Sequence, residues 1–231
     1  GHAGVEVRLN TLAEPEAVLA LEPDVVIVAT GGWPHTEILE EGNSLVDSTW
    51  DVISGNVKPQ SKVLIFDDDG TDAALSVAER LARRGSSVEL VTPDRIVGHE
   101  VYGTTFVGYL EAFYELGVRM TPDERVVAVR RDGSELVATL VNQFSGRSQE
   151  RRVDQVLVQH GTEPIADVYF DLIDGSSNGG DLDIDAFIGL EEQNIVTHAS
   201  GTYRLFRIGD AVQSRNIHAA IYEARRLCLP L

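Results

Sequence analysis

Residues 62–91, KVLIFDDDGTDAALSVAERLARRGSSVELV, decide the fold class of this chain. Lys62–Phe66 is the apolar run of a buried strand, and Asp72–Arg84 carries apolar residues along one face of a helix. Ser87–Val91 is a second apolar run, and Gly85 stands where the end of a helix favours glycine. A strand, a helix and a second strand within about thirty residues form the parallel βαβ unit of α/β proteins.

The turn between this strand and this helix has the position of a dinucleotide-binding loop but not its residues. In the motif G-x-G-x-x-G, the glycines allow a tight turn, close approach of the backbone to the pyrophosphate, and packing of the helix on the strand. Asp67, Asp69 and Asp72 stand at the three glycine positions. Thr92-Pro93 stands where an acidic residue usually binds the ribose.

Charge decides what this turn can bind. Two unit charges about 4 Å apart repel by roughly 1 kcal/mol in water, and by more when they are partly shielded from it. Several carboxylates facing a pyrophosphate would therefore outweigh the attraction of a helix N-terminus, which is about 0.3–1 kcal/mol. We predict that NADH and NADPH do not bind this unit.

Two other roles are open to the aspartates. Asp69 or Asp72 can cap the helix while the others are solvated, because Asp is among the preferred N-cap residues. Alternatively, Asp67, Asp68 and Asp69 can converge on a divalent cation, which takes oxygen ligands. We assign no metal site and no catalytic residue in this chain.

The segments on either side of residues 62–91 continue the alternation of strands and helices. We expect a strand at Val5–Leu9, a helix at Glu14–Leu21, a strand at Asp24–Thr30 that is buried on both faces, and a helix at Thr49–Ser54. A helix at Phe106–Leu116 is followed by three antiparallel strands, and a last helix runs from an N-cap at Ser214 to Cys228. The expected elements are completed by the strands Glu124–Arg131, Glu135–Gln143, Arg151–His160, Ile195–Val196 and Leu205–Gly209.

Composition restricts the classes of partner. The chain has 231 residues, a hydrophobic content of 43% and a formal net charge of −18, with lysine only at positions 58 and 62. Such a chain has no basic stripe for a nucleic acid, and its apolar runs are too short to cross a membrane. Cys228 is the single cysteine, which excludes an internal disulfide and fits a reducing cytoplasm. We expect a cytoplasmic protein without nucleic-acid or membrane partners, and leave a homo-oligomer open.

Two further motifs each join an apolar strand to glycine. Residues 24–32 read DVVIVATGG, and residues 205–211 read LFRIGDA. Glycine lets the backbone approach a ligand closely, and a helix beginning after Gly209-Asp210 would offer amides to a phosphate. The arginines beside this motif, Arg207 and Arg215, can pair with phosphate or with the acidic residues of the chain.

This ordered pair of motifs resembles the flavoproteins that contain two dinucleotide-binding domains, the disulfide reductase-like group. The resemblance implies that the backbone of Ala29, Thr30 and Gly31 passes near FAD. It also implies that Asp210, with Gly209 and Ala211 beside it, binds the ribityl or pyrophosphate region. A degenerate nicotinamide-type domain lies between the two motifs in that group, as it does here.

Four segments narrow the resemblance: FDDDG (66–70), VTPDR (91–95), SNG (177–179) and LFRIGDAV (205–212) followed by SRNIHAAI (214–221). Together they resemble the C-terminal part of the NADH:flavin oxidoreductase family that includes trimethylamine dehydrogenase, most nearly the dimethylglycine and N-methylproline demethylases. The family implies an N-terminal barrel with FMN, a four-iron cluster, and a C-terminal part that binds FAD or ADP. This chain lacks the barrel, and its one cysteine cannot ligate a cluster that needs four thiolates. It also lacks the first βαβ unit of the flavin half.

We therefore predict an α/β, Rossmann-like module of the FAD/NAD(P)-binding type, with three layers, an antiparallel β-meander and a truncated flavin half. Residues 48–165 form a degenerate NAD(P)-binding-like domain, and residues 1–47 with 166–231 form the remnant of the FAD/ADP-binding half. The Gly1-His2 start without methionine indicates a piece of a longer protein.

The predicted function is that of a non-catalytic C-terminal fragment of an N-methyl amine demethylase or dehydrogenase. Its partner would be the missing N-terminal barrel, and we expect no tightly bound cofactor in this chain alone. The alternative is a non-catalytic scaffold that binds ADP or FAD or mediates oligomer contacts.

Overall fold

The computed structural model describes residues 4–231, so Gly1 and His2, on which the expectation of a trimmed start rests, lie outside it. The chain folds as two compact units: the residues up to Trp33 with Thr162–Leu231 form unit 1, and Pro34–Gly161 form unit 2. Residues 34–47, which the sequence analysis placed with the flavin half, fall in unit 2, where Leu39 is buried in the core. The assignment of the two nucleotide functions to these units stays a prediction.

Unit 2 is built on a five-stranded sheet in which every neighbouring pair is parallel. The strand order is β3-β10-β4-β5-β6. The predicted βαβ unit is confirmed: β4 and β5 pair in parallel from Lys62 with Ser87 to Phe66 with Val91. The strands are β3 (Asp47–Ser48), β4 (Lys62–Asp67), β5 (Ser87–Val91), β6 (Arg119–Thr121) and β10 (Gln155–Gln159).

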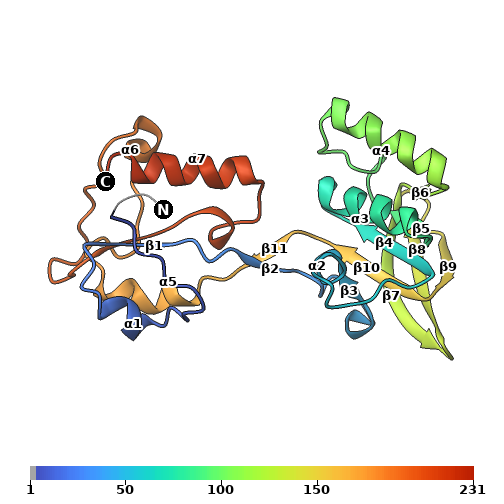
Figure 1. Cartoon of the computed structure of the whole chain (residues 1–231), viewed down its shortest axis with the longest axis horizontal. Helices are drawn as coiled ribbons and strands as arrows, with labels where there is room; N and C mark the ends of the chain where they lie inside the picture. The colour runs from blue at the N-terminus through green and yellow to red at the C-terminus, as the bar shows by residue number, and fades with distance from the viewer. Residues whose placement is uncertain (1–3) are drawn as a thin grey trace. The chain divides into compact units, whose positions relative to one another are not determined.

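Two different layers cover the faces of this sheet, as Figure 1 shows. One face packs on helices α2 (Thr49–Ser54), α3 (Asp72–Arg83) and α4 (Gly103–Leu116). The other face packs on the antiparallel meander β7-β8-β9. The three-layer α/β prediction with a meander is therefore confirmed. The meander strands are β7 (Glu124–Asp132), β8 (Glu135–Asn142) and β9 (Ser148–Val153).

Helix α3 follows from its apolar face and its C-terminal glycine. Leu75, Ala78 and Leu81 are fully buried against the sheet. After the C-cap Arg84, Gly85 adopts a φ of +93°. The Gly85 amide then donates to Ala82 O and the Ser86 amide to Leu81 O, which is the Schellman pattern that glycine permits.

Tertiary contacts alter two of the predicted elements. The expected strand Arg151–His160 divides at Asp154, because the Asp154 amide donates to Lys62 O and its carboxylate accepts from the Lys62 amide. These bonds start the parallel pairing of β10 with β4, so only β9 belongs to the meander. The last helix begins after Asn216, whose side chain accepts from the Ala219 amide. Ser214, the predicted cap, instead accepts from the Thr162 amide.

Unit 1 contains a parallel pair of strands, β1 (Val25–Val28) and β12 (Arg204–Arg207). Its core joins Val26 and Val28 of β1 to Leu205 of β12 and to Tyr169 and Leu172 of α5. A further two-stranded sheet pairs β2 (Gly32–Pro34) with β11 (Thr162–Pro164). The helices of unit 1 are α1 (Pro15–Leu19), α5 (Asp167–Leu172), α6 (Ile184–Gly189) and α7 (Ile217–Cys228).

Three expectations for unit 1 are wrong. Val5–Leu9 is not a strand, and its apolar side chains are largely exposed, because no neighbouring strand pairs with it within residues 4–231. Ile195 and Val196 also lie outside any strand. Val25 and Ile27 are only half-buried, so β1 is not covered on both faces. In residues 4–231, no helix combines the length and the apolar character needed to span a bilayer.

Candidate nucleotide site

A groove of about 490 Å³ opens in unit 1 where β1 and β12 end. Because the two strands are parallel, their carboxyl ends meet at the same edge of the sheet. In open α/β sheets, ligands bind outside the carboxyl ends of the strands. This groove is therefore the candidate site, and it lies wholly within unit 1.

The fold brings together four of the six residues named from the sequence. Ala29 and Gly31 follow β1, Gly209 and Asp210 follow β12, and all four line the groove. Thr30 instead directs its hydroxyl to Ile165 O. Ala211 is fully buried in the core beneath the groove. The binding role of the six residues stays a prediction.

One wall of the groove comes from α7, which the sequence analysis identified as a helix but not as part of the site. Ile217 and Ile221 are 71% and 62% exposed, although they belong to the apolar face of that helix. The signal that could have revealed them is the apolar stripe, which the sequence analysis interpreted as packing. The wall consists of Asn216, Ile217, Ala220, Ile221 and Ala224.

Polar contacts close the strand end of this groove. The Gly209 amide donates to a carboxylate oxygen of Glu223 at 2.8 Å, and Arg215 forms an ion pair with the same carboxylate. The Arg215 amide donates to Asp210. Arg215 therefore pairs with an acidic residue. Arg207 lies over the Tyr169 ring at 4.8 Å from its centroid.

The turn after β4 in unit 2 binds its own amides. Asp67 Oδ1 accepts from the amides of Asp69 and Gly70 at 3.3 and 3.0 Å. Asp69 Oδ1 accepts from the amide of Thr71 at 3.0 Å and from its hydroxyl at 2.8 Å. The N-cap position of α3 is Thr71, so neither Asp69 nor Asp72 occupies it, as one of the two alternatives supposed. The amides that a phosphate would need at this turn are thus occupied by carboxylates.

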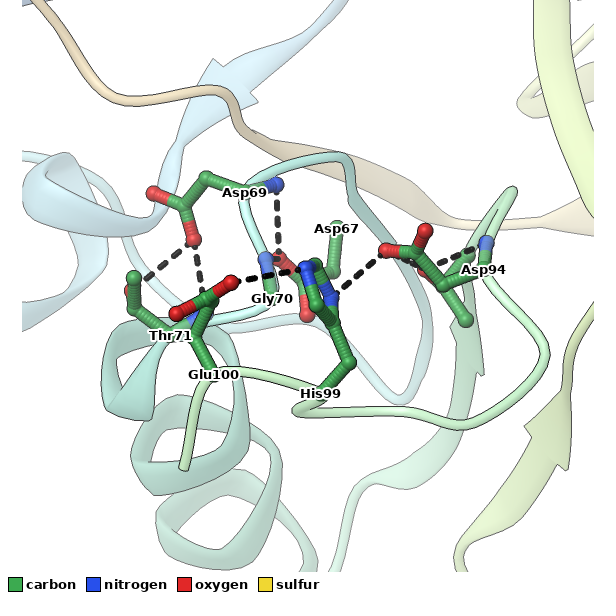
Figure 2. A network of polar contacts seen from close by, with 8 residues as sticks. Asp67, Asp69, Gly70, Thr71, Asp94, His99 and Glu100 are labelled. Atoms are coloured by element: carbon green, nitrogen blue, oxygen red, sulfur yellow. Dashed lines mark hydrogen bonds and ion pairs between the residues drawn. The ribbon is translucent and has the colours of Figure 1, made fainter. Parts of the chain in front are cut away.

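A second segment, Gly98–Val101, lies against this turn and is called the strap below. Figure 2 shows the His99 ring between Asp94 and Glu100, beside Gly70. The His99 Nδ1 lies 2.8 Å from Asp94 Oδ2, and its Nε2 lies 3.3 Å from Glu100 Oε1. Gly70 has a φ of +65°, and a Cβ there would overlap the His99 ring. The strap therefore requires glycine at this position.

Asp67 is the buried acid of this network. Its side chain is 0% exposed, and burial, followed by the neighbouring charge of Asp69, raises its pKa to about 7. Nearby, His160 Nδ1 lies 2.8 Å from Asp68 Oδ2, a distance that permits an ion pair although the angle does not suit a hydrogen bond. Among the described residues, no group of three or more acidic, histidine or cysteine side chains is arranged to hold a metal ion. The proposed cation site at Asp67, Asp68 and Asp69 is therefore not formed.

The fold and the groove define this chain as a Rossmann-like dinucleotide-fold protein with two units. No protein-family model matches it. The chain is 51% identical over 224 residues to a probable N-methylproline demethylase of Rhizobium meliloti, covering 97% of this chain and 33% of that protein. It is 43% identical over 235 residues to the N,N-dimethylglycine/sarcosine dehydrogenase of Chromohalobacter salexigens, covering 97% of this chain and 34% of that protein. The chain thus spans about a third of the length of these curated relatives.

Solved structures agree on the fold. The 6-hydroxypseudooxynicotine amine oxidase of Pseudomonas geniculata matches 96% of this chain and 31% of its own, with a TM-score of 0.77 and 22% identity. The thioredoxin reductase of Lactococcus lactis matches 87% of this chain and 63% of its own, with a TM-score of 0.62 and 20% identity. The resemblance to the demethylase branch of the NADH:flavin oxidoreductase family is confirmed by the two sequence relatives, and the Rossmann-like class by these structures.

Proposed function

We propose that this chain is the C-terminal part of a flavin-dependent enzyme that demethylates or dehydrogenates N-methylated amines. Its groove would hold FAD or ADP, while the chemistry takes place in the remainder of the longer protein. The observation that carries the proposal is the meeting of Ala29, Gly31, Gly209 and Asp210 in one groove at the carboxyl ends of two parallel strands. The names of the two sequence relatives support the substrate class.

The groove offers a nucleotide an apolar wall and a polar end. Ile217 and Ile221 on α7 can pack against the flat ring of an adenine or a flavin, because aromatic ligands gain mostly from apolar contact. Asp210 and Asn216 supply the polar groups that can orient a ribose. Glu223 already accepts from the Gly209 amide, so the diphosphate would need donors beyond that amide.

Unit 2 would not bind NADH or NADPH. The amides of Asp69, Gly70 and Thr71 already donate to carboxylates of the same turn. A pyrophosphate would have to displace those carboxylates and would meet their charge at close range. In this proposal, unit 2 serves a structural role, and electrons need not come from a nicotinamide cofactor.

A segment of the longer protein would complete unit 1. β1 pairs with β12 on one side, and no strand pairs with its other edge within residues 4–231. The outer edge of β12 is closed by Asn178, whose side chain accepts from the Leu205 amide and donates to Leu205 O at 2.8 Å each. An added strand would therefore pair with β1, because unpaired strand edges accept further strands. About two-thirds of each relative's length lies outside the match and could supply it.

Two measurements test the proposed function. In the gene's reading frame, the sequence that precedes residue 1 should encode a barrel and a cluster of four cysteines. The longer protein should then release FAD or ADP on denaturation, detected by chromatography. Ile221→Asp should lower the nucleotide affinity about tenfold or more, close to 1.4 kcal/mol, by placing a charge on the apolar wall. Ile188→Asp is the matched control, since Ile188 is 61% exposed on α6 and does not line the groove.

Calorimetry with ADP, FAD, NADH and NADPH separates the alternatives. Micromolar binding of NADH would contradict the role given to the acidic turn. Binding of ADP alone, in a protein without an upstream barrel, would favour the non-catalytic scaffold. An Ile221→Asp variant that keeps its nucleotide would remove the groove from the proposal.

A further inference from the structure

The buried carboxyl of Asp67 has one oxygen satisfied and one not. Oδ1 accepts from two backbone amides, whereas Oδ2 has no hydrogen-bond partner among the described residues. An ionised carboxylate accepts only, so its second oxygen would remain unpaired in the interior. A protonated Asp67 would bury a neutral group there and remove most of that cost.

The surroundings of Asp67 also favour the neutral form. Negative charges on Asp69 and Asp94 lie close enough to oppose its ionisation, and burial opposes it further. Histidine supplies the positive charge that the network can acquire. The ionisable groups of the cluster are Asp68, Asp69 and Asp72 in the turn and α3, Asp94 after β5, His99 and Glu100 in the strap, and His160 after β10.

The strap is attached to the turn through His99 and Glu100. The Glu100 amide donates to Gly70 O at 3.1 Å. Both ring nitrogens of His99 face carboxylate oxygens, and only the imidazolium form has a proton for each of them. Loss of that proton would leave one nitrogen facing an acceptor with nothing to donate.

We propose that the strap Gly98–Val101 and the turn Asp67–Gly70 form a proton-dependent latch, which is closed while Asp67 and His99 carry protons and loosens when they lose them. The latch covers the place where a dinucleotide-binding loop would meet its phosphate. It regulates the mobility of this edge of unit 2 and is independent of the groove in unit 1.

The direction of the pH dependence follows from Asp67. Its pKa rises from an ordinary 3.8 to about 7 in the folded chain, so the closed state binds the proton more tightly than an open, hydrated state. Closing is therefore favoured at low pH, weakens as the pH rises from about 4 to about 7, and stays constant above that. Opening should increase by up to about tenfold per pH unit in that window.

Amide hydrogen exchange measures the latch directly. The protection of the Glu100 and Gly70 amides, corrected for the intrinsic pH dependence of exchange, should fall as the pH is raised from 5 to 7 and become level above 7. Asp67→Asn cannot ionise, so its protection at these amides should not change across that range. Asp132→Asn is the control: Asp132 is an exposed carboxylate whose hydrogen bond to Arg152 lowers its pKa, and this variant should keep the native profile.

A carbon-13 titration of the Asp67 carboxyl in the unaltered chain makes the test independent of how well the variant folds. A midpoint near pH 7 supports the latch, and a midpoint below pH 5 would overturn it. Equal exchange at pH 5 and pH 8 in the native chain would overturn it as well. His99→Gln should increase exchange of the Glu100 amide most at low pH, where the imidazolium holds the strap.

Discussion

The strands β4 and β1 have similar sequences but different surroundings. Val63 to Asp67 of β4 are all buried, because β10 and β5 flank the strand and two layers cover the sheet. In β1, Val26 and Val28 are buried while Val25 and Ile27 are half-buried, because one neighbouring strand and one covered face are present. An apolar β-branched run therefore shows that a strand forms, but its neighbours decide how deeply it is buried.

The ends of the two strands differ in the opposite sense. β4 ends in a turn whose amides are occupied by Asp67 and Asp69, and whose outer side is covered by His99. β1 ends at Ala29 and Gly31, which line an open groove. The more complete sheet thus carries the closed phosphate position, whereas the smaller sheet carries the open one. Integrity of a fold and availability of its site are separate properties in this molecule.

The largest expected effect sharpens the comparison of the strands. Leu64→Ala in β4 should lower the free energy of unfolding by about 2–5 kcal/mol, because a fully buried side chain leaves a cavity. Ile27→Ala in β1 should cost only about 1 kcal/mol, because its side chain is half-buried. Urea unfolding followed by tryptophan fluorescence measures both, with Trp50 reporting on unit 2 and Trp33 on unit 1. Equal losses would show that β1 is as enclosed as β4.

The next prediction concerns the two edges of the small sheet. Asn178→Ala should lower the free energy of unfolding by about 2–4 kcal/mol, because it leaves the buried amide and carbonyl of Leu205 without partners. Asn194→Ala, at an exposed asparagine, should change it by less than about 0.5 kcal/mol. Thermal unfolding of both variants tests whether the side chain of Asn178 closes the edge of β12. A small loss at Asn178 would mean that this edge, like that of β1, tolerates being open.

The smallest expected effect concerns the closed turn. Gly70→Ala should cost about 1–3 kcal/mol, because it combines a positive φ with overlap of the His99 ring. Gly85→Ala shares the positive φ but has open space around the added methyl, and should cost about 1 kcal/mol. Hydrogen exchange at Glu100 should increase in the first variant only. Equal costs and equal exchange would show that the strap does not press on the turn.

Much of the fold was predictable because its signals are local. The βαβ unit rests on an apolar run, an amphipathic helix and Gly85, all within residues 62–91. The absence of loop glycines was also visible directly, and the structure adds that the aspartates bind the amides themselves. The predicted strand at Val5–Leu9 failed because alternation alone does not provide a partner strand.

The sequence by itself determined the α/β class, the acidic turn and the positions of the two glycine motifs, because each depends on residues adjacent in the chain. Only the tertiary structure decided that Ala29 and Gly209 meet in one groove, that α7 forms its wall, and that β10 leaves the meander to join the parallel sheet. It also decided that His99 covers Gly70 and that Asp67 is buried with an unpaired oxygen. These features arise from contacts between residues far apart in the chain, where packing and hydrogen bonding select among arrangements that local patterns leave open.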